Sequence, residues 1–161
     1  MVPTRRFRWR DGVLIGLVAA IISTLILLLA GAMSGRGLQI LTDAGMIALP
    51  ARLGSATGLS ATLSYLLCHT LFYVVAGVVA LGLAGLADRL PPLVAALLLV
   101  IIILEFGFLV LTTESQAMGL IDQVTWRSIL IGHLAGGVAL ALGIVRVHPS
   151  VRRAVVRGYE W

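Results

Sequence analysis

The sequence predicts an all-α fold: a polytopic membrane protein whose four transmembrane helices form a bundle, with a short interfacial helix between the first two. Composition is the first indication, because 60% of the 161 residues are hydrophobic and only 12% are charged. A soluble domain is about half apolar and about a quarter charged. The second indication is that four apolar segments are each long enough to cross a hydrocarbon core of about 30 Å as a helix. The mean hydropathy of +1.07 agrees.

The first predicted span covers residues 13–33 and follows a basic lead, residues 1–12, that contains Trp9. The sequence Ala30-Gly31-Ala32 imitates the cleavage site of a signal peptide. The apolar run is longer, however, than the roughly 7–15 residues of a secretory core. We therefore expect an uncleaved first helix.

Residues 34–58 form the longest break between spans, and glycines and Pro50 interrupt any long helix there. The piece 38–49 is too short to cross a bilayer. Its apolar residues are interrupted by Asp43, which favours a helix lying in the membrane interface. A re-entrant segment is the alternative.

Three further spans are predicted at 59–86, 93–113 and 124–147. A tight turn with Pro91-Pro92 separates the second span from the third, because proline suits the opening of the following helix. His148-Pro149 ends the fourth span, and residues 148–161 form a basic tail. One transmembrane domain, 13–147, is therefore expected between two short polar ends.

The distribution of arginine predicts the topology. All 12 basic residues are arginines, which is typical of a GC-rich bacterial source. Nine lie in the termini and the 87–92 turn, and three, Arg36, Arg52 and Arg127, lie on the opposite side. Because positive charge is retained in the cytoplasm, we expect a multi-pass protein of the plasma (inner) membrane with both termini cytoplasmic.

Neither the basic charge nor the single cysteine indicates another class of protein. A sequence pI near 10.7 would suggest nucleic acid for a soluble protein, but no basic stripe is interleaved with aromatic residues. We expect no nucleic-acid partner. Cys68 is alone, so it forms no intrachain disulfide, and we expect it in the core.

Polar residues recur at one depth of the predicted bundle. Glu105 interrupts the third span, and a carboxylate within a bilayer is costly unless it is protonated, paired or hydrated. Counted from the ends of their spans at about 1.5 Å per residue, the polar positions lie about 12–15 Å from one face. The predicted layer contains Glu105, His69, His133, Ser23 and Thr24, with Tyr65 and Tyr73 on the face of His69.

Several interpretations of this layer stay open. It can be a hydrogen-bonded structural layer, with no cofactor, in which Glu105 faces the bundle interior within reach of a histidine. It can hold a b-type haem between His69 and His133, or a metal bound by these histidines and Glu105. It can also relay protons or substrate. No nucleotide-binding loop, nucleophile motif or zinc-protease helix occurs in the sequence.

The leading functional prediction is a non-enzymatic accessory or structural subunit. Its expected partners are the lipid bilayer and either a larger membrane protein or a second copy of this chain. Small residues four apart, such as Gly12/Gly16 and Gly132/Gly136, predict where helices approach closely. Glu114 and Asp122 are expected to be solvated loop acids.

Overall fold

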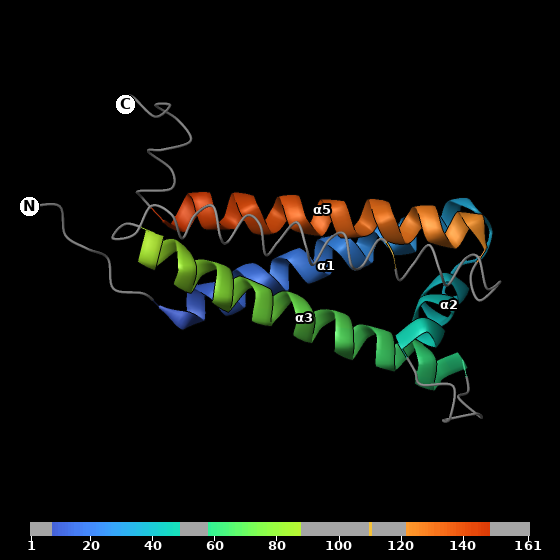
Figure 1. Cartoon of the computed structure of the whole chain (residues 1–161). Coiled ribbons are helices and arrows are strands. Elements are labelled where there is room, and N and C mark those ends of the chain that lie inside the picture. The colour runs from blue at the N-terminus through green and yellow to red at the C-terminus, as the bar shows by residue number, and fades with distance from the viewer. Residues whose placement is uncertain (1–7, 49–57, 88–109, 111–121, 149–161) are drawn as a thin grey trace, which may run out of the picture.

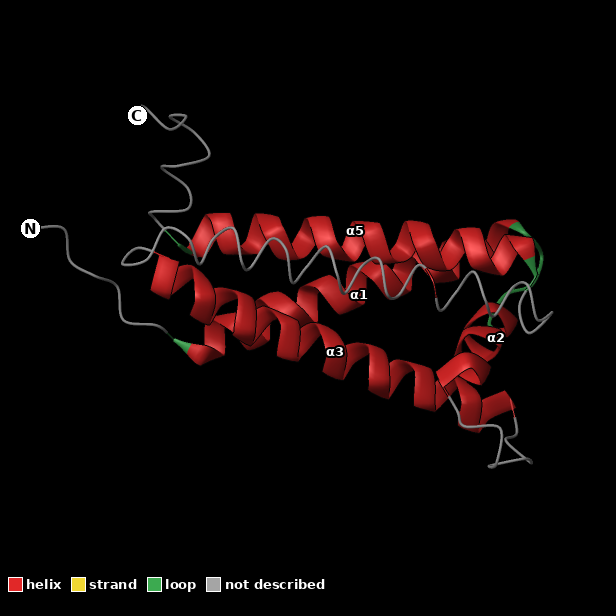
Figure 2. Ribbon diagram, viewed as in Figure 1, coloured by secondary structure: helices red, strands yellow, loops and turns green. Residues whose placement is uncertain are grey.

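The computed structural model of the chain describes residues 8–48, 58–87, 110 and 122–148. Four helices lie in this part: α1 (Trp9–Met33), α2 (Gln39–Ala48), α3 (Gly58–Ala87) and α5 (Gln123–Val147) (Figures 1 and 2). Three of them, α1, α3 and α5, are long and apolar enough to cross a membrane. The predictions of a helical fold and of a membrane environment are thus confirmed at this level.

Helix α1 packs against both α3 and α5, which make few contacts with each other. The first residues of α1 lie beside the last residues of α3 and α5, so α1 runs antiparallel to both (Figure 1). Helix α1 begins at Trp9, four residues before the expected start of the first span, and therefore includes Arg10 and Asp11. Its 25 residues measure about 37 Å, which exceeds the core of a bilayer.

Glycines bring α1 and α3 into backbone contact. A Cβ atom added at Gly12 would lie 2.7 Å from the Cα atom of Val78, and one at Gly16 would lie 2.6 Å from the Cα atom of Val74. Either atom would collide with the backbone of α3, so only glycine permits this approach. Close packing through small residues is a main source of helix association where lipid removes the hydrophobic drive.

Helix α2 lies at the end of the molecule where α3 and α5 begin (Figure 1). It crosses α3 so closely that a Cβ atom on Gly45 would lie 2.5 Å from the carbonyl carbon of Ala61. Its buried residues Ile40, Leu41 and Ala44 join Leu27 of α1 and Ile129 of α5 in one hydrophobic cluster. The helix falls within the segment where the sequence predicts one, and it buries an apolar face against the bundle.

The outer surfaces of the long helices are apolar. Exposed leucines recur every four residues along α3, at Leu59, Leu63, Leu67 and Leu71. Such surfaces suit contact with lipid chains and not with water. Cys68 is exposed on the same helix, so the expectation that it belongs to the core was wrong. Its place is set by the helical turn, because the positions beside it, Leu67 and Leu71, also face outward.

Several predicted features lie outside the described residues. They include the third span, 93–113, except residue 110, and thus Glu105, as well as the Pro91-Pro92 turn and the tail beyond His148.

Candidate functional site

The middle of the bundle brings together three of the predicted polar residues, Ser23, Tyr73 and His133. All three are at least 95% buried. Gly136 makes room for them, since a Cβ atom there would lie 2.6 Å from the Cζ atom of Tyr73 and 3.0 Å from the Cβ atom of Ser23. A glycine on α5 therefore provides the space in which side chains from α1 and α3 meet.

A hydrogen bond joins α3 to α5 at this point. The Tyr73 hydroxyl donates to the backbone carbonyl oxygen of His133 at 3.0 Å. The Nδ1 atom of the same histidine lies 3.4 Å from the hydroxyl, and its role there depends on the tautomer. A residue four positions further along α5 would normally use that carbonyl, so the tyrosine adds a second donor to it.

Aromatic side chains of α3 extend from this contact toward the start of the helix. Tyr65 stacks on His69 with centroids 4.8 Å apart, and His69 meets Tyr73 edge-on at 4.9 Å. The Tyr73 and His133 rings are 5.7 Å apart. Within the described part of the chain, the buried Nε2 atom of His69 has no hydrogen-bond partner. The predicted stripe of Tyr65, His69 and Tyr73 thus forms a continuous aromatic row that reaches His133.

Two further predicted site residues, Thr24 and Glu105, have no contact with this group that the described residues record. Thr24 is half-buried on α1, next to Ser23, and Glu105 lies outside the described residues. In the parts of the chain that the structure describes, no three His, Cys, Asp or Glu side chains lie close enough together to hold a metal ion. The predicted axial ligands of a b-type haem are His69 and His133. The Tyr73 ring lies beside both of their imidazoles.

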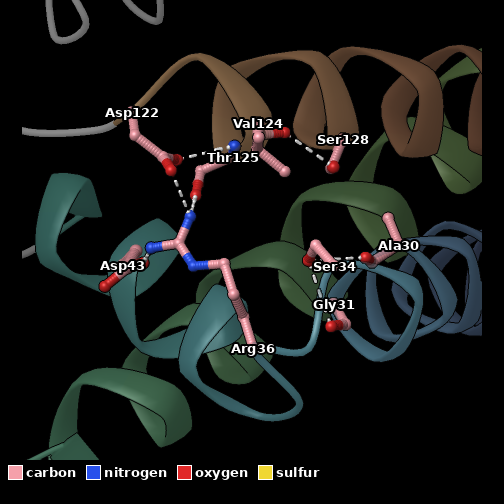
Figure 3. A network of polar contacts seen from close by, with 9 residues as sticks. All are labelled: Ala30, Gly31, Ser34, Arg36, Asp43, Asp122, Val124, Thr125 and Ser128. Carbon is pink, nitrogen blue, oxygen red and sulfur yellow. Dashed lines mark hydrogen bonds and ion pairs between the residues drawn. The ribbon is translucent and has the colours of Figure 1, made fainter.

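A second polar group lies at the end of the bundle where α1 ends and α5 begins (Figure 3). Arg36, in the loop between α1 and α2, contacts Asp43 of α2 at 2.5 Å and Asp122, which caps α5, at 2.6 Å. It also donates to the Thr125 hydroxyl at 2.8 Å. We call these four residues, Arg36, Asp43, Asp122 and Thr125, the arginine clasp.

The sequence Ser34-Gly35-Arg36-Gly37 positions the arginine. Gly35 and Gly37 have φ angles of +71° and +54°, a conformation that side-chain-bearing residues rarely adopt. The amides of Arg36 and Gly37 both donate to the carbonyl of Gly31, which closes the end of α1. The chain thereby reverses sharply, and the Arg36 side chain points between α2 and α5 (Figure 3).

The clasp also contains the N-cap residue of α5, Asp122. Asp122 accepts a hydrogen bond from the backbone amide of Thr125 at 2.8 Å, as an N-cap residue does. Hydrogen bonding from Thr125, and then the neighbouring Arg36, lowers the pKa of Asp122 to about 2. The hydrogen bond to Asp122 and the two carboxylate charges raise the pKa of Arg36, so the guanidinium stays charged.

The sequence did not reveal the clasp. Asp122 was expected to be a solvated loop acid, and this is wrong, because it is ion-paired although its side chain is 50% exposed. Two local signals were present: the glycines on both sides of Arg36, and an aspartate three residues before Thr125, the spacing of an N-cap. Neither signal says that Arg36 reaches Asp122, which is 86 residues away.

No family model, curated protein or solved structure matches the chain.

Proposed function

We propose that this chain is a four-span, non-enzymatic membrane protein that acts as a structural or accessory subunit. The observation that carries the proposal is the packing of Ser23 and Tyr73 around Gly136, together with the hydrogen bond from Tyr73 to His133. These polar groups come from α1, α3 and α5, and their packing helps to hold the three helices together. Such packing and hydrogen bonding between helices fix their register. We infer that a bundle held in this way serves as a rigid partner for another membrane protein.

The remaining features of the proposal follow from the arrangement of charge and apolar surface. The arginine distribution supports a position in the bacterial inner membrane with both termini in the cytoplasm. Helix α2 then lies at the outer interface, and the span 93–113 completes the bundle. The exposed leucines of α3 are available for lipid, for a larger membrane protein or for a second copy.

Substitution of Tyr73 by phenylalanine tests the structural role. We expect Tyr73→Phe to lower the free energy of unfolding in mild detergent by about 0.6–1.7 kcal/mol, the range for hydrogen bonds between membrane helices. Tyr65→Phe is the matched control, since this tyrosine lies on the same helix and no hydrogen bond from its hydroxyl is observed in the described residues. Equal effects of the two substitutions would contradict the structural role of the Tyr73 contact.

Purification tests the subunit role. Extraction of the tagged full chain in mild detergent should yield a complex of fixed stoichiometry with one larger membrane protein or with further copies of this chain. Crosslinking through Cys68, which is exposed on α3, would report which surface is covered. A protein that is purified and remains a monomer without a partner in nanodiscs would argue against this proposal.

The alternative function is a redox protein or a relay that uses His69, Glu105 and His133. The specific observation in its favour is the buried Nε2 atom of His69, which lacks a partner in the described residues. A purified sample with Soret absorbance or bound metal would support the redox form. For the relay, vesicles containing the protein should transport protons, and Glu105→Gln should abolish this transport.

A further inference from the structure

The end of the bundle opposite the arginine clasp contains arginines of a different kind. Arg8 and Arg10 lie at the start of α1, and Arg146 lies in the last turn of α5. All three are exposed. Among the described residues, the ion pairs are those of Arg36, so none joins these three arginines to a carboxylate. We call Arg8, Arg10 and Arg146 the basic end.

Packing contacts place these arginines at one level. A Cβ atom on Gly143 would lie 2.6 Å from the Cγ2 atom of Ile15. Because α1 and α5 are antiparallel, Arg146 then lies about level with the first turn of α1. Asp11, in that turn, is the one carboxylate of α1, so the described side chains leave an excess of positive charge there.

The exposed apolar surface of α1 begins next to these arginines. Trp9 is 57% exposed, and the Arg10 guanidinium lies 5.6 Å from the centre of its ring. Leu14 and Leu17, the next outward-facing residues of α1, are 63% and 37% exposed. An exposed tryptophan at the end of an apolar surface is typical of the headgroup region of a bilayer. With Trp9 at the headgroup level of a bilayer, the three guanidinium groups would lie at the depth of lipid phosphates.

We propose that the basic end binds the headgroups of anionic phospholipids. These charges have no counter-ion among the described residues, and they lie beside an exposed tryptophan at the end of the apolar surface. Such a site is complementary to a phosphate that remains attached to its acyl chains. Guanidinium groups bind phosphate oxygens through paired N–H donors. Each arginine near an anionic membrane surface strengthens binding by about fivefold.

A lipid titration of the full chain tests this proposal. The protein in mild detergent is mixed with increasing phosphatidylglycerol, or with phosphatidylcholine of the same acyl chains, and bound lipids are counted by native mass spectrometry. We expect preferential retention of phosphatidylglycerol. The substitution Arg146→Gln should weaken this retention about fivefold, and Arg10→Gln should weaken it similarly.

Arg127→Gln is the matched control, because Arg127 is also exposed on α5 but lies at its opposite end. Retention by this variant should equal that of the wild type. Equal retention of the two lipids, or an equal loss in Arg127→Gln and Arg146→Gln, would overturn the proposal. So would full competition by glycerol 3-phosphate at the concentration of the lipid, since the site would then bind soluble phosphate, or by a polyglutamate peptide, which would indicate a protein partner.

Discussion

The two ends of the bundle use arginine in opposite ways. At the clasp, one arginine contacts two carboxylates and a hydroxyl from α2 and α5, and only 23% of its side chain is exposed. At the basic end, three exposed arginines form no ion pair with another described residue. The guanidinium group is the same, so its surroundings determine its role. One end is closed by the protein itself, and the other presents its charge outward.

This difference has a physical basis in the chain around each arginine. The backbone at Arg36 is fixed in a tight turn, because the amides of Arg36 and Gly37 both donate to the carbonyl oxygen of Gly31. Holding a long side chain in one geometry otherwise costs conformational entropy and leaves most surface ion pairs with a small net effect. The arginines at the helix ends have no such turn, and their charge stays available for lipid. We therefore expect substitutions at the two ends to change different properties.

Removal of the Arg36 guanidinium should give the largest change in stability. Arg36→Met leaves Asp43 and Asp122 without a counter-ion, and Thr125 loses a donor. We expect a loss of about 1–2 kcal/mol in the free energy of unfolding, measured in mixed detergent micelles. Two partly exposed ion pairs contribute about 0.2–1 kcal/mol each, and the hydrogen bond to Thr125 adds to them. Arg127→Met is the control and should stay within about 0.5 kcal/mol of wild type. A loss below that limit in Arg36→Met would mean that the clasp is only a surface contact.

Acid should weaken the clasp through Asp122. The pKa of this carboxyl is lowered from 3.8 to about 2 in the folded protein, so the unfolded chain takes up its proton first as the pH falls. The stabilisation is thus complete above about pH 5 and declines as the pH falls from there to about 2. The melting temperature should decrease in this range. In Asp122→Asn, which preserves a capping side chain, this part of the decrease should be absent; an unchanged pH profile in the variant would contradict the assignment to Asp122.

The two ends also differ in how far the sequence predicts them. The positions of α1, α3 and α5 follow from long apolar runs, because a helix is the form that satisfies its own backbone within lipid. Arginine counting treats Arg36 as one of three charges on its side of the membrane and takes no account of its partners. Which carboxylates it contacts depends on how the α1–α2 turn is folded and how α5 is placed beside it, and neither is encoded in local spacing.

The middle of the bundle shows the same limit on a smaller scale. The period of the helix places Tyr65, His69 and Tyr73 on one stripe, and these rings do form a row. The sequence does not say that the Tyr73 hydroxyl donates to a backbone carbonyl of α5. That contact needs the close approach of helices at Gly136, and the space around a glycine is known only once the helices are packed.

The smallest change in stability is expected at the basic end. In detergent without lipid, Arg146→Gln should cost about 0.3–1 kcal/mol, the value of an exposed cation in the last turn of a helix. Arg10→Gln should cost no more, because it removes one exposed cation–π contact with Trp9. The free energies of unfolding of both variants, compared with that of Arg36→Met, measure the contrast between the two ends. If Arg146→Gln were as destabilising as Arg36→Met, Arg146 would have a protein partner, and charge at this end would not be free for anionic lipid.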